Sequence, residues 1–211
     1  MWILTPDLER PEVAEAALEA ALDRVDAIQV RLKLPGRRSG PSPAGPLLEW
    51  TRRVLALRAR MGPGDGPLVF VNDRPDVARV LAEEGLDGVH LGDRDLNPES
   101  ARDYLPEGVL LGLSTHHPEE VLHAQERPVD YLGFGPVFAT ATKGYTRGHG
   151  PERAWIAQEG SGLPVFPIGG IDLTNAEQLE EVGRAAVGAA ITDAVDPAGA
   201  ADHLRAALGG A

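Results

Sequence analysis

The stretch DYLGFGPVFATATKG, residues 130–144, joins a short apolar run to a polar loop, and this junction decides the fold. Its first part, YLGF at 131–134, has the length and apolar character of a buried β-strand. The loop that follows is rich in glycine and also carries a proline, two threonines and a lysine. Hydrogen-bond donors therefore gather where a strand ends, and the other strand ends of the chain can be compared with this one.

Short apolar runs alternate along the chain with longer amphipathic stretches, which is the pattern of repeated βα units. Eight apolar runs predict strands, at residues 2–5, 27–32, 68–71, 88–91, 109–113, 131–134, 163–168 and 185–191. Helices are expected between them, among others at residues 11–24, 47–61, 75–85, 118–127, 174–183 and 197–208. A doubly wound open sheet usually has fewer strands and a GxGxxG motif after the first strand, and that motif is missing. We therefore expect an α/β protein, a (β/α)8 TIM barrel, with one domain over residues 1–211.

The composition narrows the class of protein. Of the 211 residues, 43% are apolar and 25% charged, so we expect a soluble globular protein with a large core. The net charge of -12 argues against a general nucleic-acid binder. The absence of cysteine excludes disulfides and thiolate nucleophiles and suits a reducing cytoplasm. We recognise no export signal and no membrane span. The sequence leaves the oligomeric state open and allows a homo-oligomer.

A glycine- and proline-rich segment, LPGRRSGPSPAGP at 34–46, follows the second predicted strand. A loop of this length is often a lid over an active site, but the same composition also fits a disordered linker. The sequence leaves both interpretations open.

The second predicted strand carries polar residues in alternation, at Gln29, Arg31 and Lys33. Side chains two residues apart point to the same face of a strand, which in a barrel is the interior or its mouth. Two cations on that face need an anion, because an unpaired buried charge is costly. The anion is either a bound ligand or a carboxylate of the barrel.

Acidic residues follow the next two predicted strands. Asn72 and Asp73 follow the third, and Asp93 and Asp95 follow the fourth. Carboxylates close to two cations predict a divalent metal with a polyphosphate, since Mg²⁺ prefers oxygen ligands and substrate phosphates. The alternative for each aspartate is a helix cap.

The fifth predicted strand ends in Ser114, Thr115, His116 and His117. The serine could donate to an anion and a histidine could transfer protons, although the run PEEV that follows also fits a helix N-terminus. His90, on the fourth strand, is interpreted as a packed barrel residue. No H-E-x-x-H spacing occurs, which disfavours zinc.

Glycine-rich segments follow the last two predicted strands, at 169–172 and 188–190. In TIM barrels these two loops usually hold a phosphate on backbone N–H groups, and glycine lets the backbone approach the oxygens closely. We therefore expect two anion sites, one with a metal and one without.

With these pieces in order, the chain resembles the thiamine phosphate synthase family from WILTPD to the C-terminal helix. The matching motifs are QVRLK, VNDR, DGVHLGDRDL, GLSTHHPEE, YLGFGPVFATATK, PIGGI and the AAI of the last predicted strand. Each motif is moderately specific, and their order along the whole chain is highly specific. The resemblance implies an enzyme that joins hydroxymethylpyrimidine diphosphate to thiazole phosphate, with Mg²⁺ as cofactor.

The resemblance also implies roles for individual residues. The pyrimidine diphosphate would be contacted by Gln29, Arg31, Lys33, Asn72, Ser114 and Lys143. Thiazole phosphate would be bound by Thr140, Thr142, Gly170, Gly188 and Ala189. Asp73 and Asp95 would hold Mg²⁺. Catalysis would be dissociative, with Arg31, Lys33, Ser114 and Lys143 stabilising the departing diphosphate and no protein nucleophile.

Three positions depart from the family pattern: Leu32 replaces an acidic residue, Asp93 a glutamine and Ala189 a serine. Two other functions remain open. The related thiazole tautomerases use a histidine after the fifth strand, where this chain has His116. A non-catalytic phosphate-binding barrel is the other alternative.

Overall fold

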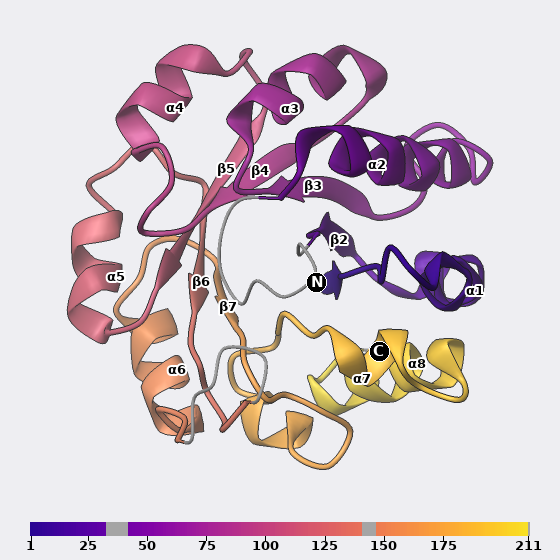
Figure 1. Ribbon diagram of the computed structural model, residues 1–211. Coiled ribbons are helices and arrows are strands. Elements are labelled where there is room, and N and C mark those ends of the chain that lie inside the picture. The colour runs from indigo at the N-terminus through magenta and orange to yellow at the C-terminus, as the bar shows by residue number, and fades with distance from the viewer. Residues whose placement is uncertain (33–41, 141–146, 211) are drawn as a thin grey trace.

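The strands of the protein form one curled parallel sheet that follows the order of the chain, as Figure 1 shows. The computed structural model describes residues 1–32, 42–140 and 147–210. Within these residues the sheet has seven strands. Their bounds are β1 Trp2–Leu4, β2 Ala27–Val30, β3 Leu68–Asn72, β4 Gly88–Leu91, β5 Leu110–Thr115, β6 Tyr131–Phe134 and β7 Val165–Pro167.

Helices cover the outer side of this sheet (Figure 1). The α-helices are α1 Pro11–Ala21, α2 Ala44–Arg58, α3 Pro75–Leu81, α4 Pro98–Tyr104, α5 Pro118–Ala124, α6 Pro151–Glu159, α7 Ala189–Thr192 and α8 Pro197–Ala207. Short 3₁₀-helices lie at η1 Leu22–Arg24, η2 Ala82–Glu84 and η4 Ala176–Leu179. Proline opens α1, α3, α4, α5, α6 and α8, because the first turn of a helix needs no backbone N–H from it.

The eighth strand, predicted at 185–191, is much shorter than expected. Ala186 and Val187 form isolated parallel bridges to Ile168 and Trp2, and these bridges join β7 to β1. The next residues turn into α7 because Gly188 is its N-cap and alanine favours a helix. The barrel therefore closes through two residues.

Two other predicted elements differ at their ends. Helix α2 starts at Ala44, before the predicted start at 47, because the proline at 46 falls within its first turn. The segment predicted as a helix at 174–183 contains only the 3₁₀-helix η4. Most of the glycine- and proline-rich segment 34–46 lies outside the described residues, so both interpretations of it remain untested.

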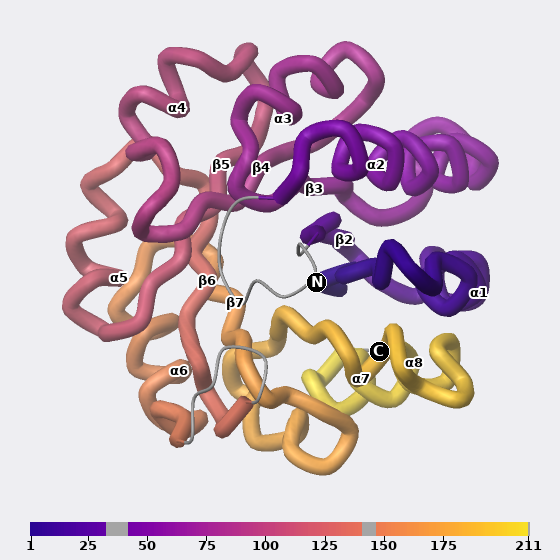
Figure 2. The backbone as a smooth tube through the Cα atoms, in the orientation of Figure 1, coloured from indigo at the N-terminus to yellow at the C-terminus, as the bar shows by residue number. Residues whose placement is uncertain are grey.

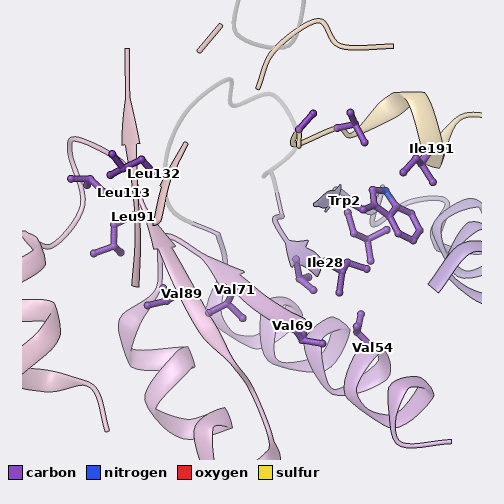
Figure 3. Packing of buried hydrophobic residues seen from close by; sticks show 14 of the residues in the cluster. Trp2, Ile28, Val54, Val69, Val71, Val89, Leu91, Leu113, Leu132 and Ile191 are labelled. Carbon is purple, nitrogen blue, oxygen red and sulfur yellow. The ribbon is translucent and has the colours of Figure 1, made fainter. Parts of the chain in front are cut away.

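The main hydrophobic core lies between the sheet and its helices (Figure 3). Outward-facing strand residues such as Ile28, Val69 and Leu132 are fully buried there, together with Val54 of α2. The alternate residues point into the barrel, where Phe70 and Tyr131 form a second, smaller cluster. This period of two leaves the inner face free for polar residues near the strand ends.

The first and last helices of the chain lie side by side. Figures 1 and 2 show α8 beside α1, and the side chain of Arg205 bonds Asp26 Oδ1 at 2.8 Å. Within the described residues, no helix has the length and apolarity needed to cross a membrane.

Candidate functional site

A cavity of about 590 Å³ lies inside the barrel and reaches the carboxyl ends of the strands. Its wall takes residues from all seven strands and from the two-residue closure at Ala186 and Val187. The carboxyl ends of barrel strands are where catalytic residues of this fold converge. The expected place of the site is therefore a real cavity.

Four predicted ligands of the pyrimidine diphosphate line this cavity: Gln29, Arg31, Asn72 and Ser114. Gln29 and Asn72 are buried, at 4% and 5% exposure. Polar side chains this deeply buried need partners, either within the protein or on a ligand. The fold thus brings together predicted residues from three strands and from Arg31, which directly follows β2.

Four predicted ligands of the second phosphate also line the cavity: Thr140, Gly170, Gly188 and Ala189. Lys33, Thr142 and Lys143 lie outside the described residues, so their predicted roles remain predictions. The loop that opened the sequence analysis is therefore described only up to Thr140.

Arg31 directly follows β2 and is largely buried. Desolvation lowers the pKa of its guanidinium, and the charge of Asp73 opposes this shift. The charge of a carboxylate at the barrel end therefore acts on this cation, so the two alternatives for the anion are not exclusive. Arg31 still lines the cavity, where it is available to a ligand.

Asp73 has an unusual backbone conformation, with φ at 65°. Its N–H donates to the carbonyl of His90 at 2.8 Å. This left-handed region is tolerated by aspartate and fixes the direction in which the chain leaves β3. The N-cap of α3 is Arg74, without a side-chain capping bond, so the structure gives the capping alternative for Asp73 no support.

Asp95 lies in the turn after β4. Its Oδ2 accepts a hydrogen bond from the backbone N–H of Gly92 at 2.7 Å. Helix α4 is capped by Asn97, so the structure gives the capping alternative for Asp95 no support. Neither Asp73 nor Asp95 lines the cavity. The described residues contain no cluster of three or more His, Asp or Glu side chains able to hold a metal.

Ser114 lies within β5 and does not cap the following helix. Its Oγ lies 2.9 Å from Nε2 of His90, whereas the N-cap of α5 is His117, without a side-chain capping bond. Glu120 of that helix instead accepts from the backbone N–H of His116. His116 also lines the cavity, as the tautomerase alternative requires.

Sequence analysis did not assign His90 and Tyr131 to the cavity wall. His90 is indeed packed inside the barrel, but it also lines the cavity and bonds Ser114 and the Tyr131 hydroxyl. The pattern that could have found both is the period of two: Gly88 and His90 share a face, as do Tyr131 and Gly133.

The glycines after β7 are required by the backbone. Gly170 has φ at 66°, and a Cβ there would lie 2.4 Å from the carbonyl oxygen of Ala139. The two loops pack directly on each other, since the N–H of Phe138 donates to the carbonyl of Gly169 at 2.9 Å. After the barrel closure, Gly188 and Ala189 begin α7, and the first N–H groups of a helix have no acceptor within it.

Of the departures from the family pattern, Leu32 is explained by its surroundings. It is 2% exposed, and its backbone N–H and carbonyl both bond the hydroxyl of Ser42 at 3.1 Å. An acidic side chain would be buried there without water. Asp93 is exposed and forms a loose ion pair with Arg94 at 3.9 Å.

Comparisons with known proteins agree with this geometry. The family model described as thiamine monophosphate synthase matches residues 1–195. A thiamine-phosphate synthase of Thermus thermophilus is 43% identical over 198 residues, 92% of each chain. One of Mycobacterium tuberculosis is 39% identical over 206 residues, 95% of this chain and 90% of the other. The solved thiamine phosphate pyrophosphorylase of Pyrococcus furiosus superposes with a TM-score of 0.77 at 31% identity, covering 99% and 94% of the two chains.

Proposed function

The chain belongs to the thiamine monophosphate synthase family, and we propose how its cavity joins a pyrimidine diphosphate to a thiazole phosphate. The protein is accordingly an enzyme of thiamine biosynthesis, a thiamine-phosphate synthase that releases diphosphate. The observation that carries the residue assignments is the convergence of eight predicted ligands on one cavity. Its place in the cell is proposed to be the cytoplasm.

The diphosphate lies toward the β2, β3 and β5 side of the cavity. Arg31 offers a fixed positive charge there, and Gln29, Asn72 and Ser114 offer neutral donors. Lys33 and Lys143 belong to the same proposal, on the strength of the family motif alone. Donors held in place before the reaction stabilise the charge that develops on a leaving group.

Asp73 and Asp95 follow neighbouring strands and offer hard oxygen ligands, which fit Mg²⁺. Oδ2 of Asp95 is bonded to Gly92, so its other oxygen is the one available to a cation. Bound Mg²⁺ would neutralise charge on the diphosphate, whose oxygens and water would complete its coordination. Two carboxylates and a substrate phosphate are a usual ligand set for this ion.

The thiazole phosphate lies toward the β6, β7 and β1 side. Thr140 offers a hydroxyl, with Thr142 assigned by the motif, while Gly170, Gly188 and Ala189 offer backbone N–H groups. Gly170 and Gly188 carry no side chains, so the space for the phosphate beside their backbone stays open. Ala189 lacks the hydroxyl usual in the family, so backbone groups carry more of the phosphate contact.

The reaction needs no protein nucleophile. The bond between the pyrimidine methylene carbon and the diphosphate oxygen breaks, and its electron pair leaves with the diphosphate. The thiazole nitrogen then donates its lone pair to the methylene carbon. This chain's residues bind both substrates, hold the nitrogen close to the carbon and stabilise the leaving charge.

The test is to supply purified protein with both substrates and Mg²⁺ and to measure thiamine phosphate and diphosphate. Equal amounts of the two products, formed only when both substrates are present, would support the proposal. His116 lines the cavity, so the same samples are assayed for thiazole isomerisation. Isomerisation without thiamine phosphate would favour the tautomerase, and binding without either reaction would favour the non-catalytic barrel.

A further inference from the structure

Four polar side chains form a connected network across the inside of the barrel. Nε2 of His90 lies 2.9 Å from Oγ of Ser114, and its Nδ1 lies 3.1 Å from the hydroxyl oxygen of Tyr131. The side chain of Gln29 acts on that hydroxyl as a donor that lowers its pKa, and its Nε2 also donates to Sδ of Met1 at 3.8 Å. The network therefore links β2, β6, β4 and β5, and all four residues line the cavity.

Glycines leave room for the two rings of this network. A Cβ at Gly112 would lie 2.1 Å from Cζ of Tyr131, and a Cβ at Gly133 would lie 3.1 Å from Cε1 of His90. The Tyr131 ring also packs edge-on against Phe70 and Phe166, with centroid distances of 5.4 and 5.6 Å. The glycine backbone and the neighbouring aromatic rings thus hold the rings of His90 and Tyr131 in place.

The hydroxyl of Tyr131 keeps its proton. Burial raises the pKa of this group well above its ordinary value, and the hydrogen bond from Gln29 opposes the shift. A partner that lowers the pKa of a phenol is one that donates to its oxygen. Nδ1 of His90 is the acceptor that the structure places beside this hydroxyl, at 3.1 Å, so the Tyr131 proton is directed to it.

The state of the imidazole follows from this direction. A neutral histidine carries one proton, so an Nδ1 that accepts from Tyr131 requires the proton on Nε2. The Nε2–H then donates to Oγ of Ser114. With that side of the oxygen occupied, the hydroxyl proton of Ser114 turns to the cavity.

We propose that His90 is a positioning residue, held by Tyr131 as the Nε2–H tautomer so that Ser114 donates its hydroxyl proton into the cavity. This assignment rests on the proposed function, in which Ser114 contacts the anionic diphosphate. In the opposite tautomer, Ser114 would donate to His90 and turn only oxygen lone pairs to that anion. The network thus fixes whether Ser114 attracts or repels the leaving group.

Ring-¹⁵N labelling of histidine tests the tautomer directly. The chain has six histidines, and the His90→Gln variant identifies the His90 signals by their loss. The expected result is a protonated Nε2 and an unprotonated Nδ1 in the free protein. A protonated Nδ1, alone or together with Nε2, would overturn the proposal.

A double-mutant cycle tests the route from Tyr131 to Ser114. Tyr131→Phe removes the hydroxyl and keeps the ring that packs on Phe70 and Phe166, so we expect kcat to fall about tenfold, as for one lost hydrogen bond. The KM for thiazole phosphate should not change. In a Ser114→Ala background, the same substitution should have no further effect. Fully additive losses would contradict a route through the Ser114 hydroxyl.

The two experiments separate this inference from the proposed function. The labelling needs no substrate, so an inactive protein with the Nε2–H tautomer would refute the synthase assignment and leave the tautomer standing. An active synthase with a protonated Nδ1 would refute the role of His90 alone. Phe70→Leu is the packing control: it should lower thermal stability and leave the His90 tautomer unchanged.

Discussion

Arg31 and Asp73 follow the neighbouring strands β2 and β3, and the charge of Asp73 supports a guanidinium that burial disfavours. Burial removes much of the water around this guanidinium, and the charge of Asp73 replaces only part of the stabilisation that the water gives. An anionic ligand that enters the cavity supplies the rest. The pair therefore prepares the cavity for a negatively charged substrate.

Replacing Arg31 by methionine should abolish most of the synthase activity. The substitution keeps the bulk of the stem and removes the charge, so kcat/KM should fall by about 100-fold or more, as for the loss of one fixed transition-state contact. Steady-state kinetics with both substrates measure this. Arg60→Met, at an exposed site after α2, is the matched control and should leave kcat/KM unchanged. Equal kinetics in the two variants would contradict the diphosphate role of Arg31.

The metal assignment predicts a common defect in Asp73→Asn and Asp95→Asn. Asparagine tolerates the left-handed φ of 65° at position 73, and it can still accept from the N–H of Gly92 at position 95, so both folds should persist. Each variant should need much more Mg²⁺ for half-maximal activity, and the wild-type enzyme should stop with EDTA and recover with added Mg²⁺. The measurement is a Mg²⁺ titration of initial rates.

Asp93→Asn is the control for that titration, because Asp93 lies in the same loop with its side chain 70% exposed. It should leave the Mg²⁺ dependence unchanged. A defect equal to that of Asp95→Asn would show that the wrong carboxylate has been assigned. Activity that persists in EDTA would remove the metal from the proposal.

Much of the fold could be predicted because strands and helices of a barrel differ in hydrophobic period. The length of the eighth strand could not, since only Ala186 and Val187 pair there, through backbone bridges whose extent the alanine-rich run does not reveal. Site residues at strand ends were found from their charge, as with Arg31. His90 was assigned to packing alone because its partners are distant in sequence: Tyr131 is 41 residues away.

Replacing Gly170, in the loop after β7, by alanine should lower the stability of the fold. Gly170→Ala combines a φ of 66° with a Cβ placed 2.4 Å from the Ala139 carbonyl oxygen, so the loop must move. We expect the free energy of unfolding to fall by about 3 kcal/mol, beyond the 1–2 kcal/mol or so of a left-handed alanine. Urea denaturation measures it. Gly108→Ala isolates the conformational part, because φ is 86° there and nothing lies within 4 Å of the new Cβ; equal losses would show that the loop contact is unimportant.

His149 predicts how stability depends on pH. Its backbone N–H donates to the carbonyl of Pro136 at 2.8 Å, and its ring lies against that of His117 at a centroid distance of 5.5 Å. Burial first, and then the charge of His117, lowers the pKa of His149 below its ordinary value of 6.5. The unfolded chain therefore binds more protons than the folded one below that pH, so this residue's contribution to stability is complete above about pH 6.5 and is lost as the pH falls.

Replacing His149 by glutamine should reduce the loss of stability at low pH. Glutamine places an amide near the position of Nε2 and does not titrate, so the urea midpoint should fall less between about pH 7.5 and 5 than in the wild type. His203→Gln, at an exposed site on α8, should keep the wild-type slope. If His149→Gln keeps that slope as well, the acid sensitivity belongs to other groups, and the contact between His149 and His117 does not destabilise the folded protein at low pH.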